Sequence, residues 1–384
     1  MRRLTRAVLR RARAAVGPGR RGGSEHGAAA AIVAIVAGMG VMMGMGAVVI
    51  DVGRLYAERE QLLSGADAAA RALAEQCVRT AADCGQNATA QGFANANAND
   101  GTAGVAAICG NGPNLSPGCP APTNLTGCLG EAPADINYVE AHTETQIQGG
   151  GSILPGTFIK ALTGGAYAGA TVAACARAAW GPPARARGLS LTFSVCEWND
   201  LTGDGLNLWP SGGGTPPASS ERVVTFHTTK SLSGCPAGPS GWDAPGSFGW
   251  LDEDGTGLCE VTVDDDGSYG GDPGASASQN CRTALDSLHE DRVEIPIPIY
   301  DGVRGAGSNT EYHLAGFASF VLTGYRFPGA SANSWLPGGT VCPNTHGGST
   351  TYVCGYFTSG RLLPIGQIAT SGANFGVVVV DLVG

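Results

Sequence analysis

The longest run of hydrophobic positions lies near the N-terminus. Between Gly27 and Asp51 there are 23 residues, 28–50, without a charged or polar side chain. At 1.5 Å per residue a helix of this length extends about 35 Å, enough to cross a hydrocarbon core of roughly 30 Å. A backbone in lipid must satisfy its own hydrogen bonds, so this segment must be helical despite its glycines. The pattern predicts a transmembrane helix over residues 28–50.

Two other interpretations of this run stay open. The first is a buried helix of a soluble domain, which the charges on both flanks disfavour. The second is a cleaved secretory signal, whose apolar region is usually about 7–15 residues and ends in a small-residue cleavage site. The run here is longer, and the residues after it, Asp51-Val-Gly-Arg-Leu-Tyr56, contain no Ala-x-Ala site.

The helical pattern continues beyond the apolar run. Charged residues alternate with leucines over residues 54–63, and an alanine-rich stretch follows at residues 65–74. Alanine is the strongest helix former, and no proline occurs between residue 28 and Pro113. We therefore expect one continuous helix over about residues 28–75. Its second half lies outside the bilayer and has a mixed face able to pack on a sheet.

The remaining sequence alternates between short strand patterns and turns. Residues 81–134 are loop-like, with helical order near residues 88–97, and a helical turn is expected at 158–162. Alternation and β-branched or apolar residues predict strands at 136–147, 170–180, 189–198, 222–229, 293–300, 312–327 and 375–383. Pro296 and Pro298 each lack a backbone donor on the same side, which predicts an edge strand.

These patterns predict an α+β protein. We expect a long N-terminal transmembrane helix that continues into a helix-on-sheet domain, followed by a β-rich disulfide-bonded extracellular domain. The expected division is a basic tail at 1–27, the span at 28–50, a helix with a small sheet at 51–181, and a β-rich domain at 189–384. Charged residues are only 14% of the chain, against roughly 25% in ordinary soluble domains, and Gly (61) and Pro (22) favour turns and short strands.

Charge is distributed unevenly along the chain. The net charge is -9, but residues 1–27 carry one acid, Glu25, and eight arginines: Arg2, Arg3, Arg6, Arg10, Arg11, Arg13, Arg20 and Arg21. Nucleic acid is one partner for such a tail, but the neighbouring span supplies a better reason for it. Because arginines precede the span, the positive-inside rule places the N-terminus in the cytoplasm and residues 51–384 outside the cell. We expect a lipid bilayer as a partner and no nucleic acid.

The cysteines agree with this topology. There are 12, and the first, Cys77, follows the span. Disulfides persist in oxidising compartments, so cysteines confined to the outer part fit an extracellular location. No Cys-x-x-Cys pair occurs, which disfavours structural zinc. Pairing cannot be deduced from sequence, and we expect local bridges between Cys77 and Cys84 and between Cys342 and Cys354, with no free thiol.

Residues 21–74 resemble the N-terminal region of the TadE/TadG-like proteins of Flp (Tad) pilus assembly. The residues that carry the resemblance are the small-residue span at 28–50, the element Asp51-Val-Gly-Arg-Leu-Tyr56 and the run Ala66-Asp-Ala-Ala-Ala70. The resemblance implies a membrane-anchored, pseudopilin-like subunit that helps to assemble a surface pilus used in adhesion. It also implies that the N-terminal helix contacts other pilus or pseudopilin subunits.

The chain departs from the family in two respects. Processed pilins have Gly before the cut and Glu five residues after it, but here Gly19 places Glu25 at the sixth position. Counting five residues back from Glu25 gives Arg20, so an uncut anchor is favoured. The Asp-x-Ser-x-Ser metal motif that some TadG-like proteins carry is also missing from this sequence.

Within the span, Gly40-x-x-x-Gly44 offers small residues for close helix contact, with Ala34 and Gly38 nearby. The alternative is that glycine is simply common in such spans. The packing interpretation predicts that this face of the helix contacts neighbouring subunits.

Motifs for catalysis are absent from the sequence, so we expect no enzyme and assign no catalytic, cofactor-binding or metal residues. The histidines are dispersed, and His313 is expected to be a packed or surface side chain. Two acidic patches, at residues 252–257 and 264–267, resemble calcium loops, because calcium prefers several oxygen ligands on a tight turn. Thr256 and Val263 occupy positions where an EF-hand has ligands, so solvated turns are favoured, as they are for Asp200 and Asp204.

The expected function is therefore structural. The chain is expected to be a single-pass cell-membrane subunit of Flp/Tad pilus assembly, with a role that extends to adhesion. One alternative is a calcium-stabilised surface adhesin unrelated to pili, and a less favoured one is an anchored extracellular hydrolase.

Overall fold

The computed structural model describes residues 24–119, 130–226, 248–272, 274, 276–305, 307–338, 342, 351–363, 366–369 and 372–383. The arginine tail up to residue 23 lies outside the described residues. Two compact units are present. The first contains the chain up to Ala57 together with Ile153–Ala170, and the second contains Glu58–Ser152 and Thr171–Gly384. The expected four-part division of the chain stays a prediction.

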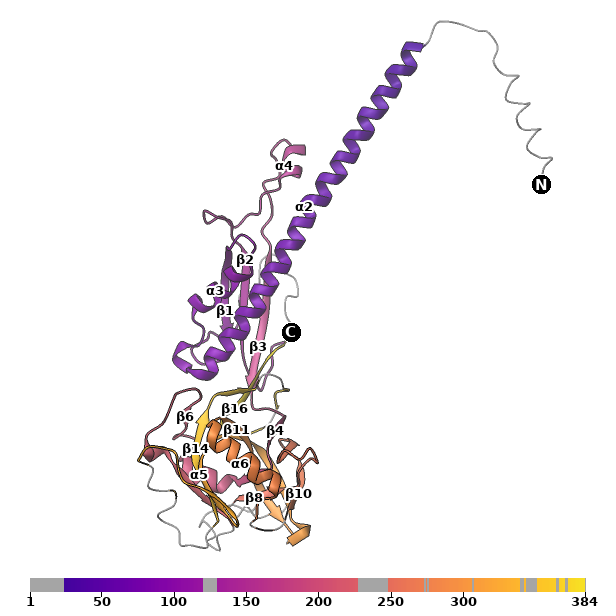
Figure 1. Cartoon of the computed structure of the whole chain (residues 1–384). Helices are drawn as coiled ribbons and strands as arrows, with labels where there is room; N and C mark the ends of the chain where they lie inside the picture. Colours follow the sequence, from indigo (N-terminus) through magenta and orange to yellow (C-terminus); the bar gives the residue numbers. More distant parts are fainter. Residues whose placement is uncertain are drawn as a thin grey trace, which may run out of the picture. The chain divides into compact units, whose positions relative to one another are not determined.

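One continuous helix begins the described chain. Helix α2 runs over Ser24–Arg79, 56 residues, and contains the whole helix expected at 28–75 (Figure 1, indigo). It ends where Cys77 forms a disulfide with Cys84 across the short 3-10 helix η1 (Ala81–Asp83). This confirms the first expected bridge. The long apolar helix and the β-rich, disulfide-bonded part after it confirm the α+β class.

A five-stranded sheet lies against the outer half of this helix. Its order is β1-β2-β3-β16-β15, with only the β15–β16 pair parallel. The strands are β1 (Ala103–Gly110), β2 (Asn137–Thr145), β3 (Ala173–Gly181), β15 (Arg361–Leu363) and β16 (Val377–Leu382). Strands β2, β3 and β16 confirm the expected ones. The interpretation of residues 81–134 as loop-like was wrong at β1, where an alanine-rich, weakly patterned segment is held by pairing with β2.

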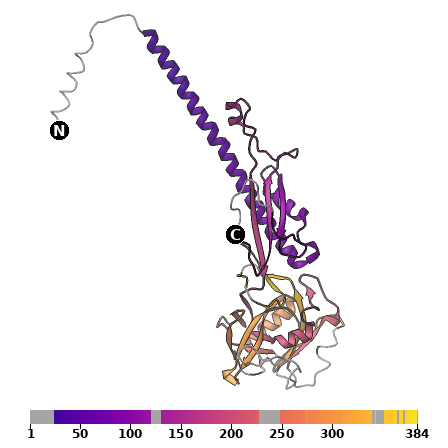
Figure 2. The same cartoon turned by 180° about the vertical axis from the view of Figure 1, so that it is seen from behind.

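Small side chains let α2 approach this sheet closely. Ala66, Ala69, Ala70, Leu73 and Ala74 recur at helical spacing and are all fully buried. They pack in one cluster with side chains from three strands, namely Val139, Ala141, Ala176, Ala178, Trp180, Val378 and Val380. Figure 2 shows the helix and the strands beside it from behind. Helix α3 (Asn87–Asn97) covers another side of α2, where a Cβ on Gly65 would lie 3.2 Å from the Cα of Ala94.

A larger, nine-stranded sheet forms the core of the remaining chain. Its path is β10-β8-β5-β11-β12-β14-β6, and β13 and β7 pair with β12 and β14. The strands are β5 (Leu191–Ser194), β6 (Trp209–Pro210), β7 (Arg222–Thr225), β8 (Phe248–Leu251), β10 (Ser268–Asp272), β11 (Glu294–Arg304), β12 (Glu311–Phe327), β13 (Ala330–Ala332) and β14 (Tyr352–Ser359). Strands β4 (Arg185–Leu189) and β9 (Glu260–Asp264) form a separate pair.

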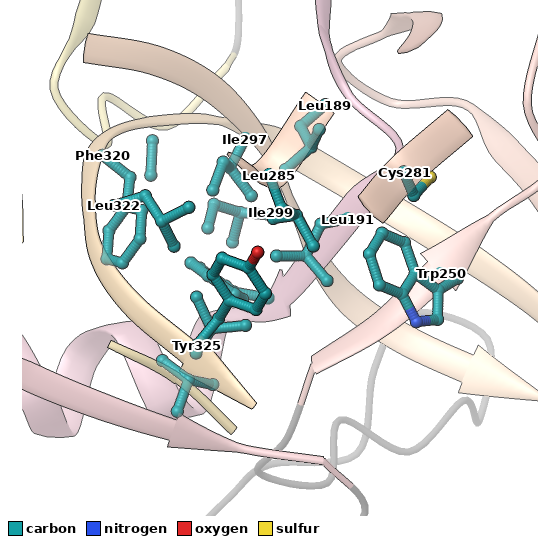
Figure 3. Close-up of a cluster of buried hydrophobic side chains, with 14 of the residues drawn as sticks. Leu189, Leu191, Trp250, Cys281, Leu285, Ile297, Ile299, Phe320, Leu322 and Tyr325 are labelled. Atoms are coloured by element: carbon teal, nitrogen blue, oxygen red, sulfur yellow. The ribbon is translucent and has the colours of Figure 1, made fainter. Parts of the chain in front are cut away.

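Helix α6 (Gln279–Asp291) supplies the other side of this core. Its buried Cys281 and Leu285 meet side chains from β5, β8, β11 and β12 (Figure 3). Edge-to-face aromatic contacts order the cluster, as between Phe193 and Phe320, whose ring centroids lie 5.3 Å apart. The chain also contains the short elements α4 (Phe158–Leu162), η2 (Ala218–Ser220) and η4 (Gly307–Asn309).

Two strand expectations were wrong. The strand expected at 189–198 ends at Ser194, whose hydroxyl accepts a hydrogen bond from the Cys196 N–H and caps helix α5 (Val195–Thr202). The strand with Pro296 and Pro298 is not an edge strand as a whole, because β11 pairs with β12 on one side and with β5 at Ile299. Both prolines come before Ile299, where the pairing with β5 begins. At the proline positions β11 pairs, among the described strands, with β12 alone, so their missing N–H groups remove no hydrogen bond to β5.

Disulfides connect several of these elements. The expected bridge between Cys342 and Cys354 is confirmed. Two further bridges join Cys109 to Cys119 and Cys259 to Cys281, the latter linking the segment before β9 to α6. Every cysteine in the described part of the chain is disulfide-bonded.

Candidate functional site

The most conspicuous surface of the protein is the first half of α2. Its large apolar side chains are exposed, among them Ile32 at 61%, Met42 at 74% and Val49 at 69%. The helix contains an 18-residue window with a mean hydropathy of 2.3 and is long enough to cross a membrane. An apolar surface of this extent marks a contact with lipid or with another protein. It is a candidate single-pass membrane anchor.

The glycines of this half-helix face open space. A Cβ built on Gly38, Gly40 or Gly44 meets no described atom within 4 Å. The fold of the chain itself therefore does not require small residues at these positions. The expected close contact of this face with another helix stays a prediction.

The apolar run ends at Asp51, whose carboxylate binds the start of helix α4. The side chain of Asp51 is 5% exposed and accepts hydrogen bonds from three backbone N–H groups, those of Thr157 at 3.2 Å, Phe158 at 2.9 Å and Ile159 at 2.7 Å. These N–H groups lie at the start of α4, where no intrahelical acceptor is available. The N–H of Ile159, followed by the other two and by Arg54, holds the pKa of Asp51 below its usual value against the opposing effect of burial.

Other residues of the same element complete this contact. Arg54 Nη1 donates to Thr157 Oγ1, and Tyr167 packs on Gly156, where an added Cβ would lie 2.7 Å from the ring. A small cavity of about 70 Å³ remains between the helix and the segment. Asp51 and Arg54 of the family-like element thus hold residues 153–159 against α2, while Tyr56 is 64% exposed.

The run Ala66-Asp-Ala-Ala-Ala70 lies inside the protein. Its alanines at 66, 69 and 70 pack on the five-stranded sheet, and burial raises the pKa of Asp67. This face of the helix packs against the sheet of the same chain. The apolar half before residue 51, in contrast, is exposed.

The first acidic patch is engaged in local structure. Asp254 Oδ1 accepts the Thr256 N–H at 3.1 Å, and Thr256 holds the pKa of this carboxyl below its usual value. Glu253 accepts the hydroxyl of Ser278 at 2.6 Å, and Ser278 is the N-cap of α6. These carboxylates stabilise a turn and a helix start.

The second patch follows β9. Asp264 lies 3.6 Å from Arg185 and accepts the Tyr269 hydroxyl at 3.2 Å, while burial, together with Asp266, raises the pKa of Asp265. Among the described residues, two groups contain three or more metal-type side chains close together. One of them combines Glu253 of the first patch with Cys259 and Cys281, and neither includes a residue of the second patch, Asp200 or Asp204. Both groups contain disulfide cysteines, which offer no thiolate to a metal.

The sequence reasoning missed a buried cluster of charges on the five-stranded sheet. Arg177 Nε donates to Glu140 Oε1 at 2.8 Å, and His142 Nε2 lies 3.2 Å from Glu140 Oε2. All three residues are less than 8% exposed. Arg177 also donates to the carbonyls of Gly130 and Glu131, so it ties the loop before β2 to the sheet. The signal was present, because Glu140 and His142 are two residues apart in a strand and share a face.

A cavity of about 420 Å³ lies between β4, α6 and the start of β11. Most of its lining is apolar, with Leu189, Leu258, Ala284, Leu288 and Ile295. Its charged lining residues, Arg187 and Glu260, form an ion pair with each other. His313, which lines no part of this cavity, pairs with Asp301 at 2.7 Å between Nδ1 and Oδ1. The cavity offers a hydrophobic surface without a free acid–base pair among the residues that line it.

Comparison with known proteins gives one result. Residues 27–76 match the family model described as putative Flp pilus-assembly TadE/G-like. The match covers the apolar half of α2, the element at 51–56 and the alanine-rich run, so it confirms the resemblance found from the sequence. No curated protein and no solved structure matches the chain.

Proposed function

We propose that this protein is a membrane-anchored, pseudopilin-like subunit of Flp/Tad pilus assembly, with a structural role that extends to adhesion. The observation that carries the proposal is the coincidence of the family match at 27–76 with a half-helix whose apolar side chains are exposed. The family is a structural one, so the match supports a pilus-related role and favours a non-enzymatic one. The pseudopilin-like type of the subunit and its role in adhesion are proposed in addition to that role.

The proposed topology places residues 28–50 in the bilayer, the arginine-rich tail in the cytoplasm and residues 51–384 outside the cell. The positive-inside rule supports this orientation, since the arginines of residues 1–27 precede the span. The disulfides support it independently, because all of them lie after the span and require an oxidising compartment. The proposed division into tail, span, residues 51–181 and residues 189–384 follows the same topology.

The proposed mechanism is lateral association through α2. Its outer half packs on a sheet, which supports the proposed pilin-like helix-on-sheet domain. The small residues of its inner half meet no described atom, and we propose that they face neighbouring subunits. Glycines spaced four apart let two helix backbones approach closely, which favours van der Waals contact in lipid. Other pilus or pseudopilin subunits are the proposed partners.

The test replaces Gly40 and Gly44 together by isoleucine in the full chain, expressed in cells of the source organism. Bulky side chains on this face should weaken crosslinking to neighbouring subunits and reduce pilus formation, while membrane insertion stays intact. A matched control replaces Val41 and Met45 by isoleucine, which keeps the hydrophobicity and the spacing but alters another face of the helix. Equal crosslinking and pilus formation in both variants would count against association through Gly40 and Gly44.

A further inference from the structure

We infer that residues 153–170, here called the arm, form a second membrane contact that lies in the lipid headgroup region beside the transmembrane helix. The inference rests on the proposed membrane anchoring of α2. It concerns a segment far from the family match in sequence, and it assigns a function to the contact between Asp51 and α4. The partner is the surface of the phospholipid bilayer.

Asp51 determines the position of the arm along the membrane normal. This residue is the first charged side chain after the apolar run, so it marks the outer edge of the hydrocarbon core. Its carboxylate is hydrogen-bonded to the N–H groups of Thr157, Phe158 and Ile159, all within 3.2 Å. Since these atoms are in direct contact, α4 must lie at the same level as Asp51. A helix that spans the membrane therefore brings the arm to the bilayer surface.

The arm carries exposed apolar side chains at this level. Phe158 is 45% exposed, Leu162 is 57% exposed and Ile153 is 47% exposed. Phe158 and Leu162 are four residues apart on α4, so they project from the same side of this helical turn. Exposed apolar side chains that are grouped in this way favour a contact, and the boundary between headgroups and acyl chains accepts them.

The charge of the arm fits the same environment. Residues 153–170 contain one charged side chain, Lys160, and no acid. Lys160 is exposed and lies between Phe158 and Leu162 in sequence. A lysine beside apolar residues can extend its ammonium group to anionic headgroups while its stem stays in the apolar region. The exposed ring of Tyr56, on the next turn of α2, is of a type enriched at this interface.

Lipid explains the arm better than a second copy of the chain does. A symmetric contact between two arms would bring two Lys160 ammonium groups together without an acid in either arm to compensate them. The arm also adjoins the end of the span, because Val52 and Leu55 line the same small cavity as Ile159. A single helix is free to rotate about its axis in a bilayer, and an interfacial arm on one side fixes that rotation.

The test introduces the photocrosslinker p-benzoylphenylalanine at Leu162 of the full chain. The protein is reconstituted in vesicles of phosphatidylethanolamine and phosphatidylglycerol that contain an alkyne-tagged phospholipid, and is then irradiated. Two control positions receive the same crosslinker: Val41, 58% exposed in the span, and Leu206, 88% exposed outside the arm. Lipid capture from Leu162 should reach the level of Val41 within a few fold and exceed that of Leu206 by about tenfold.

The outcomes separate this inference from the proposed anchor. Capture at Val41 with only background capture at Leu162 would overturn the arm inference alone, and failure at Val41 would overturn both. Capture of a second protein from Leu162 would identify a protein partner and would also overturn the inference. Replacing Asp51 by Ala releases α4, so it should lower lipid capture at Leu162 several-fold and leave capture at Val41 unchanged. Unchanged capture at Leu162 in that variant would contradict the positioning role of Asp51.

Discussion

Replacing Leu73 by Ala tests whether the outer half of α2 is part of the folded domain. Leu73 is fully buried in the cluster between α2 and the five-stranded sheet. The substitution removes three carbon groups, and at about 0.8 kcal/mol each this costs roughly 2.4 kcal/mol of transfer free energy. A partly relaxed cavity adds about 24 cal/mol per Å³, so the expected loss in the free energy of unfolding is about 3 kcal/mol.

Leu63 provides the matched control on the same helix. It is 38% exposed and belongs to none of the described core clusters. Leucine and alanine have similar helix propensities, so changes in the helix itself contribute little to either variant. Leu63→Ala should cost about 1 kcal/mol or less, because it leaves no enclosed cavity.

The assay is urea unfolding of the full chain in nondenaturing detergent with the disulfides intact. The other five tryptophans are replaced by Phe in the parent and in both variants, so that the fluorescence of Trp180, which belongs to the same cluster as Leu73, reports the loss of this packing. With a urea dependence of about 3 kcal/mol per M, Leu73→Ala should lower the midpoint by about 1 M. Equal midpoints for Leu73→Ala and Leu63→Ala would refute the packing of α2 on this sheet.

Three further predictions use the same unfolding assay. Arg177→Met leaves the buried carboxylate of Glu140 without its cation and should cost about 3–5 kcal/mol; a loss below about 1 kcal/mol would contradict the buried pair. Burial, with a smaller effect of Asp200, raises the pKa of Glu197 to about 7. The folded state therefore holds this proton more tightly than the unfolded state, and stability should fall as the pH rises from about 5 to 7. Glu197→Gln should remove that part of the pH dependence, and an identical profile would be evidence against it. Replacing Cys259 and Cys281 by Ala opens a loop with a sequence separation of 22 and should cost about 3 kcal/mol; an unchanged midpoint would show that this bridge does not stabilise the fold.

The features that depend on short stretches of chain could be predicted from the sequence. The apolar run at 28–50 and the alanine-rich stretch after it are read directly as one helix, and α2 confirms it. The bridges of Cys77 with Cys84 and of Cys342 with Cys354 join near neighbours and were also expected. Periodicity and sequence proximity carry these conclusions.

Two helices were missed although their starts carry local signals. Ser194 and Glu197 stand three residues apart, the spacing of a capping box, and Ser194 caps α5. Ser278 caps α6 and precedes Cys281 and Leu285, the buried face of that helix. The β-like composition around them outweighed these short signals.

Contacts between distant segments could not be predicted. Asp51 and Ile159 are 108 positions apart, and an aspartate after an apolar run is equally consistent with a solvated helix end. Arg177 lies directly opposite Glu140 only because β2 and β3 pair in one particular register. The C-terminal strand β16 pairs with β3 across about 200 residues, and no local pattern specifies that partner.

The central claim is that α2 anchors the chain in a membrane with residues 51–384 outside. The most direct measurement adds protease to right-side-out membrane vesicles that contain the full chain with different epitopes at its two ends. The C-terminal epitope should be removed, while the N-terminal epitope survives until the vesicles are lysed. Survival of the C-terminal epitope in intact vesicles, or release of the protein by alkaline washing, would contradict the claim.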